Sequence, residues 1–389
     1  MSEHASIPNT SPRWRRPMPA RSRDEGHRAS TPLELIFDLV FVVAVAQASA
    51  ALHHGLGSGH GLDSVITYAA MFFALWWAWM NFTWFASAYD NDDVPYRVTV
   101  FLLMTGALVF AAGVPDFAQG DLRIGVAGYV VMRLAMIVLW LRAARHDAPR
   151  RRCAQRYALG IFLTQCAWVA LLFMPAALLI PGFVVIAICE CLVPVWAERV
   201  GSTTWHAGHI AERYGLLTLI VLGESVTSLS QGVNLALSGS GLDATRLLIV
   251  AGGLLLLFSM WWFYFDRPSQ HMLASLRTAF IWGYGHYFVF AAIAAVGAGL
   301  AVQVEHPDLS ITAWAVAVPA AVYLGVLWAL HVYSRCVPKH ELLLAPVAVV
   351  LILLCPLLAG SVSTLAVGGV LVLLLALKGV TRASAARGQ

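Results

Sequence analysis

Acidic side chains interrupt one of the most apolar stretches of this chain. Glu34 and Asp38 lie in the first turns of a predicted helix over 33–54, and Gln47 lies deeper in the same stretch. Because the two acids are four residues apart, they share one face of a helix. A carboxylate inside a membrane helix is costly unless it meets a partner or water, so such residues commonly mark a function. The spacing predicts a face that binds an ion or a polar substrate.

A second apolar stretch, 208–231, carries the same residue types. Glu212 and Arg213 lie in its first turns, and Glu224 lies about 18 Å deeper along a helix. A glutamate at that depth without a fixed cation suits a proton-coupled site. The residues predicted to bind substrate or ion are therefore Glu34, Asp38, Gln47, Glu212, Arg213 and Glu224.

Further charges lie inside the predicted spans or at their ends. Burial of such charges requires that they pair across helices. We predict a supporting ion-pair network formed by Asp90, Arg97, Arg133, Glu190, Asp266 and Arg277. The alternative for the charges at helix ends is that their side chains extend to water and serve packing alone.

Composition identifies the elements that must position these side chains. The chain has 389 residues, of which 59% are hydrophobic and only 12% charged, about half the charged share of a soluble domain. With a mean hydropathy of +0.73, this pattern indicates an all-α integral membrane protein. Apolar runs predict about twelve spans, near 33–54, 64–87, 97–115, 122–142, 156–174, 178–197, 208–231, 246–266, 277–302, 312–332, 342–358 and 361–379.

The basic residues predict an orientation. With the N-terminus in the cytoplasm, every one of the 25 lysines and arginines falls in a cytoplasmic segment except Arg123, Arg133, Arg213 and Arg246. Both termini are then cytoplasmic. Residues 1–32 are polar and rich in arginine, which predicts a disordered tail beside anionic lipid headgroups, and 381–389 form a second tail.

A faint internal repeat divides the predicted spans into two halves of six, 33–197 and 198–380. Each half has an acidic first span, then a tryptophan cluster, an aspartate and an arginine, in that order. Six spans are an even number, so the two halves would be parallel, related by an axis along the membrane normal.

Several kinds of site have no motif in the sequence. It has no HExxH, GxSxG or Walker-type glycine loop, and we predict no metal and no cofactor. The ligand-like series His206, His209 and Glu212 turns too far around a helix to hold one ion. The basic residues cluster at membrane edges, so the predicted partner is the lipid bilayer and not nucleic acid.

Three stretches carry a family resemblance. They are LELIFDLVFVVAVAQ at 33–47, WWAWMNFTWFASAYDNDD at 76–93 with the following arginine, and HIAERYGLLTLIVLGES at 209–225. With them, the chain resembles the bacterial low temperature requirement protein A family. The resemblance implies a bacterial inner-membrane protein with many spans, and it marks as signature positions Glu34, Asp38, Gln47, Tyr89, Asp90, Arg97, Glu212, Arg213, Gly223 and Glu224.

Three functions fit these patterns. Paired acidic helices in a twofold-repeated bundle favour a secondary transporter or permease, proton-coupled through Glu224, over an enzyme. The first alternative is an intramembrane enzyme that acts on a lipid or isoprenoid through Asp38, Asp90, Arg97 and Glu212. The second is a sensor or scaffold, in which the charges are ion pairs that hold helices together.

Overall fold

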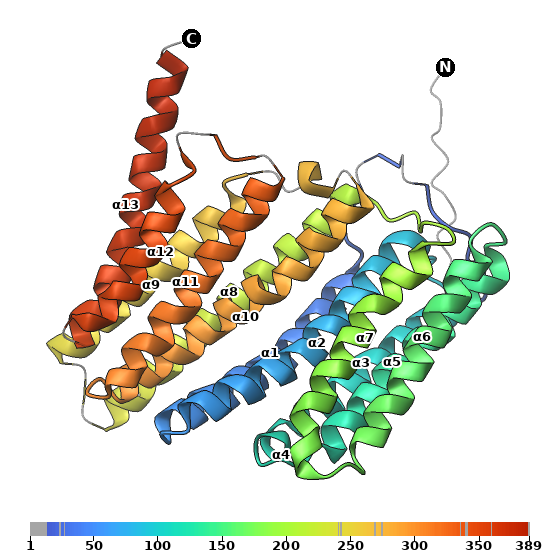
Figure 1. The fold of residues 1–389 in the computed structure, drawn as a ribbon, viewed down its shortest axis with the longest axis horizontal. Coiled ribbons are helices and arrows are strands. Elements are labelled where there is room, and N and C mark those ends of the chain that lie inside the picture. The colour runs from blue at the N-terminus through green and yellow to red at the C-terminus, as the bar shows by residue number, and fades with distance from the viewer. Residues whose placement is uncertain are drawn as a thin grey trace, which may run out of the picture. The chain divides into compact units, whose positions relative to one another are not determined.

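A computed structural model shows a chain built from helices, with no strand among the residues it describes (Figure 1). Those residues are 14–387, apart from 23, 24, 27, 240, 242, 268, 269, 274, 335, 339, 340 and 359. The all-α polytopic fold predicted from hydropathy is confirmed.

Each predicted span corresponds to one helix. These helices are α1 (Pro32–Gly57), α2 (Gly61–Tyr89), α3 (Val94–Ala112), α5 (Arg123–His146), α6 (Arg151–Leu171), α7 (Leu179–Glu198), α8 (Ala207–Ser238), α9 (Ala244–Phe265), α10 (Leu276–Glu305), α11 (Ser310–Tyr333), α12 (Leu344–Leu354) and α13 (Gly360–Arg387). The short elements between them are α4 (Val114–Ala118) and the 3-10 turns η1 (Ala176–Leu178), η2 (Gln270–Leu273) and η4 (Cys355–Leu357).

Ten of the described helices are long and apolar enough to cross a membrane. Of the twelve helices that match predicted spans, α6 and α12 fall short. Helix α6 begins with Arg151 and Arg152, and Arg156 follows within two turns. Helix α12 has 11 residues. At about 1.5 Å per residue it is roughly half as long as the hydrocarbon core is thick.

The start of α1 sets the depth of its two acids. Thr31 is the N-cap: its hydroxyl accepts a hydrogen bond from the Glu34 amide, and the Glu34 carboxylate accepts one from the Thr31 amide at 2.8 Å. Pro32 follows at the first helical position, where its missing N–H costs nothing. The helix therefore begins at Pro32, which places Glu34 in the first turn and Asp38 one turn further in.

The chain forms two compact units. Unit 1 holds the chain up to Gly26, Asn81–Ala107 and Val126–His206; unit 2 holds His27–Met80, Leu108–Gly125 and Ala207–Gln389. In unit 2, α10 packs against α8 and α11, α9 packs against α13, and α1 packs against α8 and α10 (Figure 1). In unit 1, α6 packs against α7. These units do not coincide with the predicted halves, because α1 groups with α8 and α10; the repeat itself stays a prediction.

Glycines let the helices of unit 2 approach closely. A Cβ atom added to Gly299 of α10 would lie 2.4 Å from the carbonyl oxygen of Ala315 on α11. One added to Gly297 would lie 2.7 Å from Cα of Ser225 on α8. Contacts of this kind are how helices associate where lipid removes the hydrophobic driving force.

The predicted tail is packed where the structure describes it. Met18 is fully buried, and the Arg21 amide donates to the carbonyl of Ala88, 2.9 Å away in the same unit. Residues 14–22 therefore contain a buried side chain and a backbone hydrogen bond to the end of α2, while the disordered tail predicted for 1–32 stays a prediction. The disorder predicted for 1–13 falls outside the described residues. At the other terminus, α13 continues to Arg387, past the predicted boundary at 380.

Candidate functional site

Four ionisable side chains meet in the interior of unit 2. They are Glu34 and Asp38 from α1, and His209 and Arg213 from α8, here called the α1–α8 cluster. Each pair is four residues apart, so each helix presents both of its side chains on one face. All four side chains are at most 1% exposed. The cluster is therefore dry, and its charges depend on one another for stabilisation.

Arg213 is the centre of the cluster. It binds Asp38 through two atoms, with Nε 3.1 Å from Oδ2 and Nη2 2.5 Å from Oδ1. Its third nitrogen, Nη1, lies 3.1 Å from Oε1 of Glu34. A planar guanidinium presents donors from three nitrogens in a fixed fork, whereas a lysine presents all of its donors from one nitrogen. One arginine of α8 thus holds both acids of α1.

Further donors complete the coordination of the two carboxylates. The indole N–H of Trp79 donates to Oδ1 of Asp38 at 2.7 Å. Nε2 of His209 lies 3.1 Å from Oε1 of Glu34, and the Arg28 guanidinium lies 3.8 Å from the same oxygen. The two acids balance the two arginines when His209 is neutral, so a proton taken up by His209 would leave one uncompensated positive charge.

Aromatic rings continue inward from the cluster along α8 and α10. Trp79 packs edge-on against Tyr214, with ring centroids 4.9 Å apart, and Tyr214 in turn contacts His286 at 5.0 Å. Nε2 of His286 lies 3.1 Å from the hydroxyl of Tyr264 on α9. His286 is fully enclosed, ten residues into α10. The polar groups of unit 2 therefore extend from the start of α1 toward the middle of the bundle.

The other three residues predicted to bind substrate or ion lie away from this cluster. Glu212 is partly exposed and accepts a hydrogen bond from the Ser30 amide at 3.0 Å. Gln47 is exposed, and Glu224 is partly exposed beside Gly223, where the structure leaves open space. Glu224 has no hydrogen-bond or ion-pair partner among the described residues. The structure thus brings Glu34, Asp38 and Arg213 together, and it separates Gln47, Glu212 and Glu224 from them.

Unit 1 contains a second buried pair, formed by two residues of the predicted ion-pair network. Nη2 of Arg133 lies 3.4 Å from Oε1 of Glu190, and both side chains are at most 1% exposed. The Tyr129 hydroxyl donates to the other oxygen of Glu190, and the Thr164 hydroxyl lies 3.2 Å from Oε1. These contacts join α5, α6 and α7. They have the form of a structural counter-ion pair.

The turn between α2 and α3 contains two residues of the predicted ion-pair network, Asp90 and Arg97. Arg97 binds Asp92 at 2.7 Å, while Asp90 accepts a hydrogen bond from the Asp92 amide. The buried pair in this turn is Asp93 with Arg142 of α5. Burial alone would raise the pKa of Asp93, but hydrogen bonds from Arg142 and from backbone amides outweigh burial and hold that pKa below its usual value. The sequence did not single out this pair, because three acids within four residues, Asp90, Asp92 and Asp93, give no sign of which one faces inward.

A sequence match to a known family covers most of this architecture. Residues 29–377 match the model of the bacterial low temperature requirement A protein (LtrA). The chain belongs to the LtrA family. It is also similar to an uncharacterized protein of Rhizobium meliloti, with 25% identity over 328 residues that make up 80% of this chain and 79% of that protein.

The LtrA match includes every member of the α1–α8 cluster and of the buried unit 1 pair. Two contributors to this candidate site were not predicted from the sequence. Trp79 was read as part of a tryptophan-rich segment, and His209 was considered only as a metal ligand. The spacing of His209 and Arg213, which repeats that of Glu34 and Asp38, is the signal by which the histidine could have been found. Across the described residues, no group of three or more His, Cys, Asp or Glu side chains is placed to hold a metal ion.

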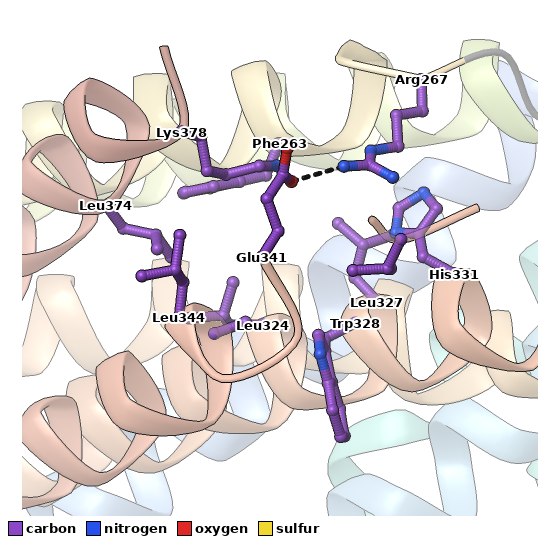
Figure 2. A pocket seen from close by; sticks show the side chains of 12 residues that line it. Phe263, Arg267, Leu324, Leu327, Trp328, His331, Glu341, Leu344, Leu374 and Lys378 are labelled. Carbon is purple, nitrogen blue, oxygen red and sulfur yellow. Dashed lines mark hydrogen bonds and ion pairs between the residues drawn. The ribbon is translucent and has the colours of Figure 1, made fainter. Parts of the chain in front are cut away.

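A third charged group joins α9, α13 and the segment before α12 in this LtrA-family chain. Asp266 binds Lys378 at 3.0 Å and Arg382 at 2.6 Å, and Arg267 binds Glu341 at 2.5 Å. Figure 2 shows Glu341 beside Arg267 at a cavity of about 40 Å³ that Lys378 also lines. Asp266 is therefore paired within the protein, whereas Arg277 is exposed and has no partner among the described residues. The predicted ion-pair network as a whole stays a prediction.

Asp266 makes the stability of the protein depend on pH in the acidic range. Burial alone would raise the pKa of Asp266, but the hydrogen bonds and charges of Arg382 and Lys378 outweigh it and lower that pKa to about 2, from 3.8. Asp266→Asn is expected to cost roughly 2 kcal/mol of unfolding free energy at neutral pH. Because the folded pKa is the lower one, this stability is present above about pH 4 and is lost as the pH falls through about 2.

The check is unfolding of wild type and Asp266→Asn in detergent micelles across this pH range. Asp63→Asn makes the same chemical change at an exposed carboxylate of α2 and serves as the control. A stability difference that stays constant from neutral pH to pH ~2 would contradict the assignment.

Proposed function

We propose that this LtrA-family membrane protein is a proton-coupled secondary transporter, and that the α1–α8 cluster is its coupling site. The observation that carries the proposal is the geometry of Arg213, which binds Glu34 and Asp38 together beside His209 in a dry interior. Ionisable groups at such positions in membrane helices are typical of proton relays. The proposal moves the coupling site from Glu224, favoured by the sequence alone, to the start of α1 and α8.

The cluster can couple a proton to helix movement because its charges balance. In a low-dielectric interior, one added proton leaves an uncompensated charge whose cost is large. Protonation of His209, Glu34 or Asp38 changes the strength with which Arg213 holds α1. Helices α1 and α8 would pair in one protonation state and separate in the other. Such a pair of helices is the two-state element that alternating access needs. In the conformation described here the cluster is closed.

The same proposal gives the protein an orientation. We place both termini on the cytoplasmic side, since most basic residues then lie inside. The α1–α8 cluster then lies near the cytoplasmic end of its helices. The arginines of the N-terminal segment are placed near anionic lipid headgroups.

The test is proton uptake by reconstituted vesicles that hold a pH-sensitive dye, with an imposed membrane potential as driving force. We expect flux in wild type, reduced roughly tenfold or more in His209→Gln and in Asp38→Asn. Asp63→Asn is the matched control, since it converts an exposed carboxylate to an amide and is expected to leave the flux unchanged. Each variant is first shown to be monodisperse in detergent, so that loss of flux does not report loss of fold. Absence of flux in wild type, or full flux in both cluster variants, would overturn the proposal.

A further inference from the structure

We propose that a groove between α1, α2, α10 and α11 of unit 2 holds one acyl chain of a membrane phospholipid. The groove encloses about 480 Å³, within the range of about 300–1,000 Å³ typical of ligand sites. It is separate from the α1–α8 cluster and shares none of its residues. The assignment rests on the chemistry of the groove, its length and its position.

The groove offers hydrocarbon surface and almost nothing polar. Its two tyrosines direct their hydroxyls to backbone carbonyls: Tyr68 donates to Ala291 at 2.7 Å, and Tyr287 donates to Ala69 at 2.9 Å. Both hydroxyls are thereby satisfied, and the remaining lining side chains are aliphatic or aromatic. A ligand with polar groups would lose its hydrogen bonds to water here without replacement. The fitting ligand is a saturated or nearly saturated chain.

The length of the groove matches one leaflet. Its lining on α11 runs from Ile311 to Val322, which is about 16 Å along a helix. The hydrocarbon core of a bilayer is about 30 Å thick, so one leaflet contributes about half of that. The groove begins beside Gly61, at the turn that joins α1 to α2, and ends near the middle of the helices.

The polar end of the groove lies at the level of a headgroup. Leu52 and Leu56 line the groove, and His53 between them turns to Glu305 of α10, 2.9 Å away. These two side chains are 16% and 18% exposed. A partly exposed contact between a histidine and a carboxylate at helix ends belongs near the membrane–water boundary. The occupant therefore comes from the leaflet on the side of the α1–α2 turn.

The exposure of the lining side chains shows how an acyl chain enters the groove. Leu52, Leu56 and Tyr68 form a buried floor, whereas Leu62 and Phe288 at the rim are 74% and 52% exposed. The groove thus opens sideways from helices that the membrane surrounds, and lipid is what meets that opening. An empty groove of this size would leave its lining without dispersion contacts.

The experiment uses a phosphatidylcholine that carries a diazirine in the middle of one acyl chain, in vesicles that contain the full chain. After irradiation, peptide mass spectrometry is expected to find label concentrated on the lining of α10 and α11. Ala295→Phe fills the groove from the partly buried position Ala295 and should lower this labelling to the level of the other spans. Ala50→Phe, which adds the same ring at an exposed position of α1, should leave it unchanged.

Val318→Trp narrows the mouth from the exposed rim and gives a second test if Ala295→Phe does not fold. Even labelling of all lipid-facing helices, unaltered by these variants, would overturn the proposal. Cross-links from the groove to a second copy of the chain would also overturn it, in favour of an interface between copies. Neither outcome depends on proton flux, so the groove and the proposed transport are tested separately.

Discussion

Replacing Arg213 with methionine is expected to lower the free energy of unfolding by about 3–5 kcal/mol, the cost of leaving buried charges without their partner. The reason is specific to this site. Arg213 binds Asp38 through two nitrogens and Glu34 through the third, and none of these side chains is more than 1% exposed. Removal of the guanidinium therefore leaves Asp38 without a cation and leaves Glu34 with Arg28, 3.8 Å away. The measurement is reversible unfolding in detergent micelles, with wild type and variant compared at the same pH.

A charge-balanced variant separates stability from function at this site. Arg213→Met combined with Asp38→Asn removes one cation and one anion and leaves Glu34 with Arg28, and a buried ion pair replaced in this way is often neutral for stability. This double variant is expected to recover most of the loss and to carry no proton flux. If Arg213→Met alone were as stable as wild type, the network would not hold α1 to α8. If the double variant still carried flux, the cluster would be structural only.

Gly299→Leu is expected to destabilise the protein by about 3 kcal/mol, since overpacking a tight contact forces the backbone to shift. The Cβ of any residue at this position would lie 2.4 Å from the carbonyl oxygen of Ala315, and backbone at that distance cannot move aside like a flexible side chain. The contact joins α10 to α11, at the centre of unit 2. We expect a lower midpoint of unfolding and a larger fraction of aggregated protein after extraction.

Gly223→Leu is the matched control for Gly299→Leu. Gly223 lies on α8 with no atom near the position of a Cβ, so a leucine there projects into open space. The substitution also replaces a glycine inside a helix, and this is expected to raise the stability of the helix by roughly 0.5–1 kcal/mol. Equal destabilisation by both substitutions would mean that the effect comes from added bulk in general and not from the α10–α11 contact.

The helices of this protein were predictable because a membrane imposes a local rule. A span needs about 20 apolar residues in succession, and that can be read without knowing what the segment packs against. The predicted range 33–54 became Pro32–Gly57, and 246–266 became Ala244–Phe265. The prediction was weaker where local signals conflict, as in α6 with its early arginines and in α12 with its 11 residues.

The members of the site were predictable in part. Glu34, Asp38 and Arg213 stood out because charges are rare in apolar segments, and the structure brings these three together. Glu224 stood out for the same reason, yet it lies partly exposed beside Gly223. The rarity of charged residues in apolar segments shows which charges need a partner or water. It does not show whether such a charge faces a neighbouring helix or open space.

The partners of these charged residues could be identified only from the tertiary structure. Trp79 is one of several tryptophans in its segment, and nothing local distinguishes the one whose indole reaches Asp38. The grouping of α1 with α8 and α10, in place of the predicted halves, is likewise decided by contacts between residues about 175 positions apart.

The sequence by itself determined that this is an all-helical membrane protein, where its helices begin, and that acids interrupt its first and seventh spans. Only the tertiary structure decided that one arginine holds two of those acids, that Glu224 stands apart, and that a groove one leaflet long opens beside Tyr68. The physical reason is that hydropathy and capping act within a few residues along the chain. The rotation of each helix about its axis is set by packing against helices that are distant in sequence, and that rotation selects which side chains meet.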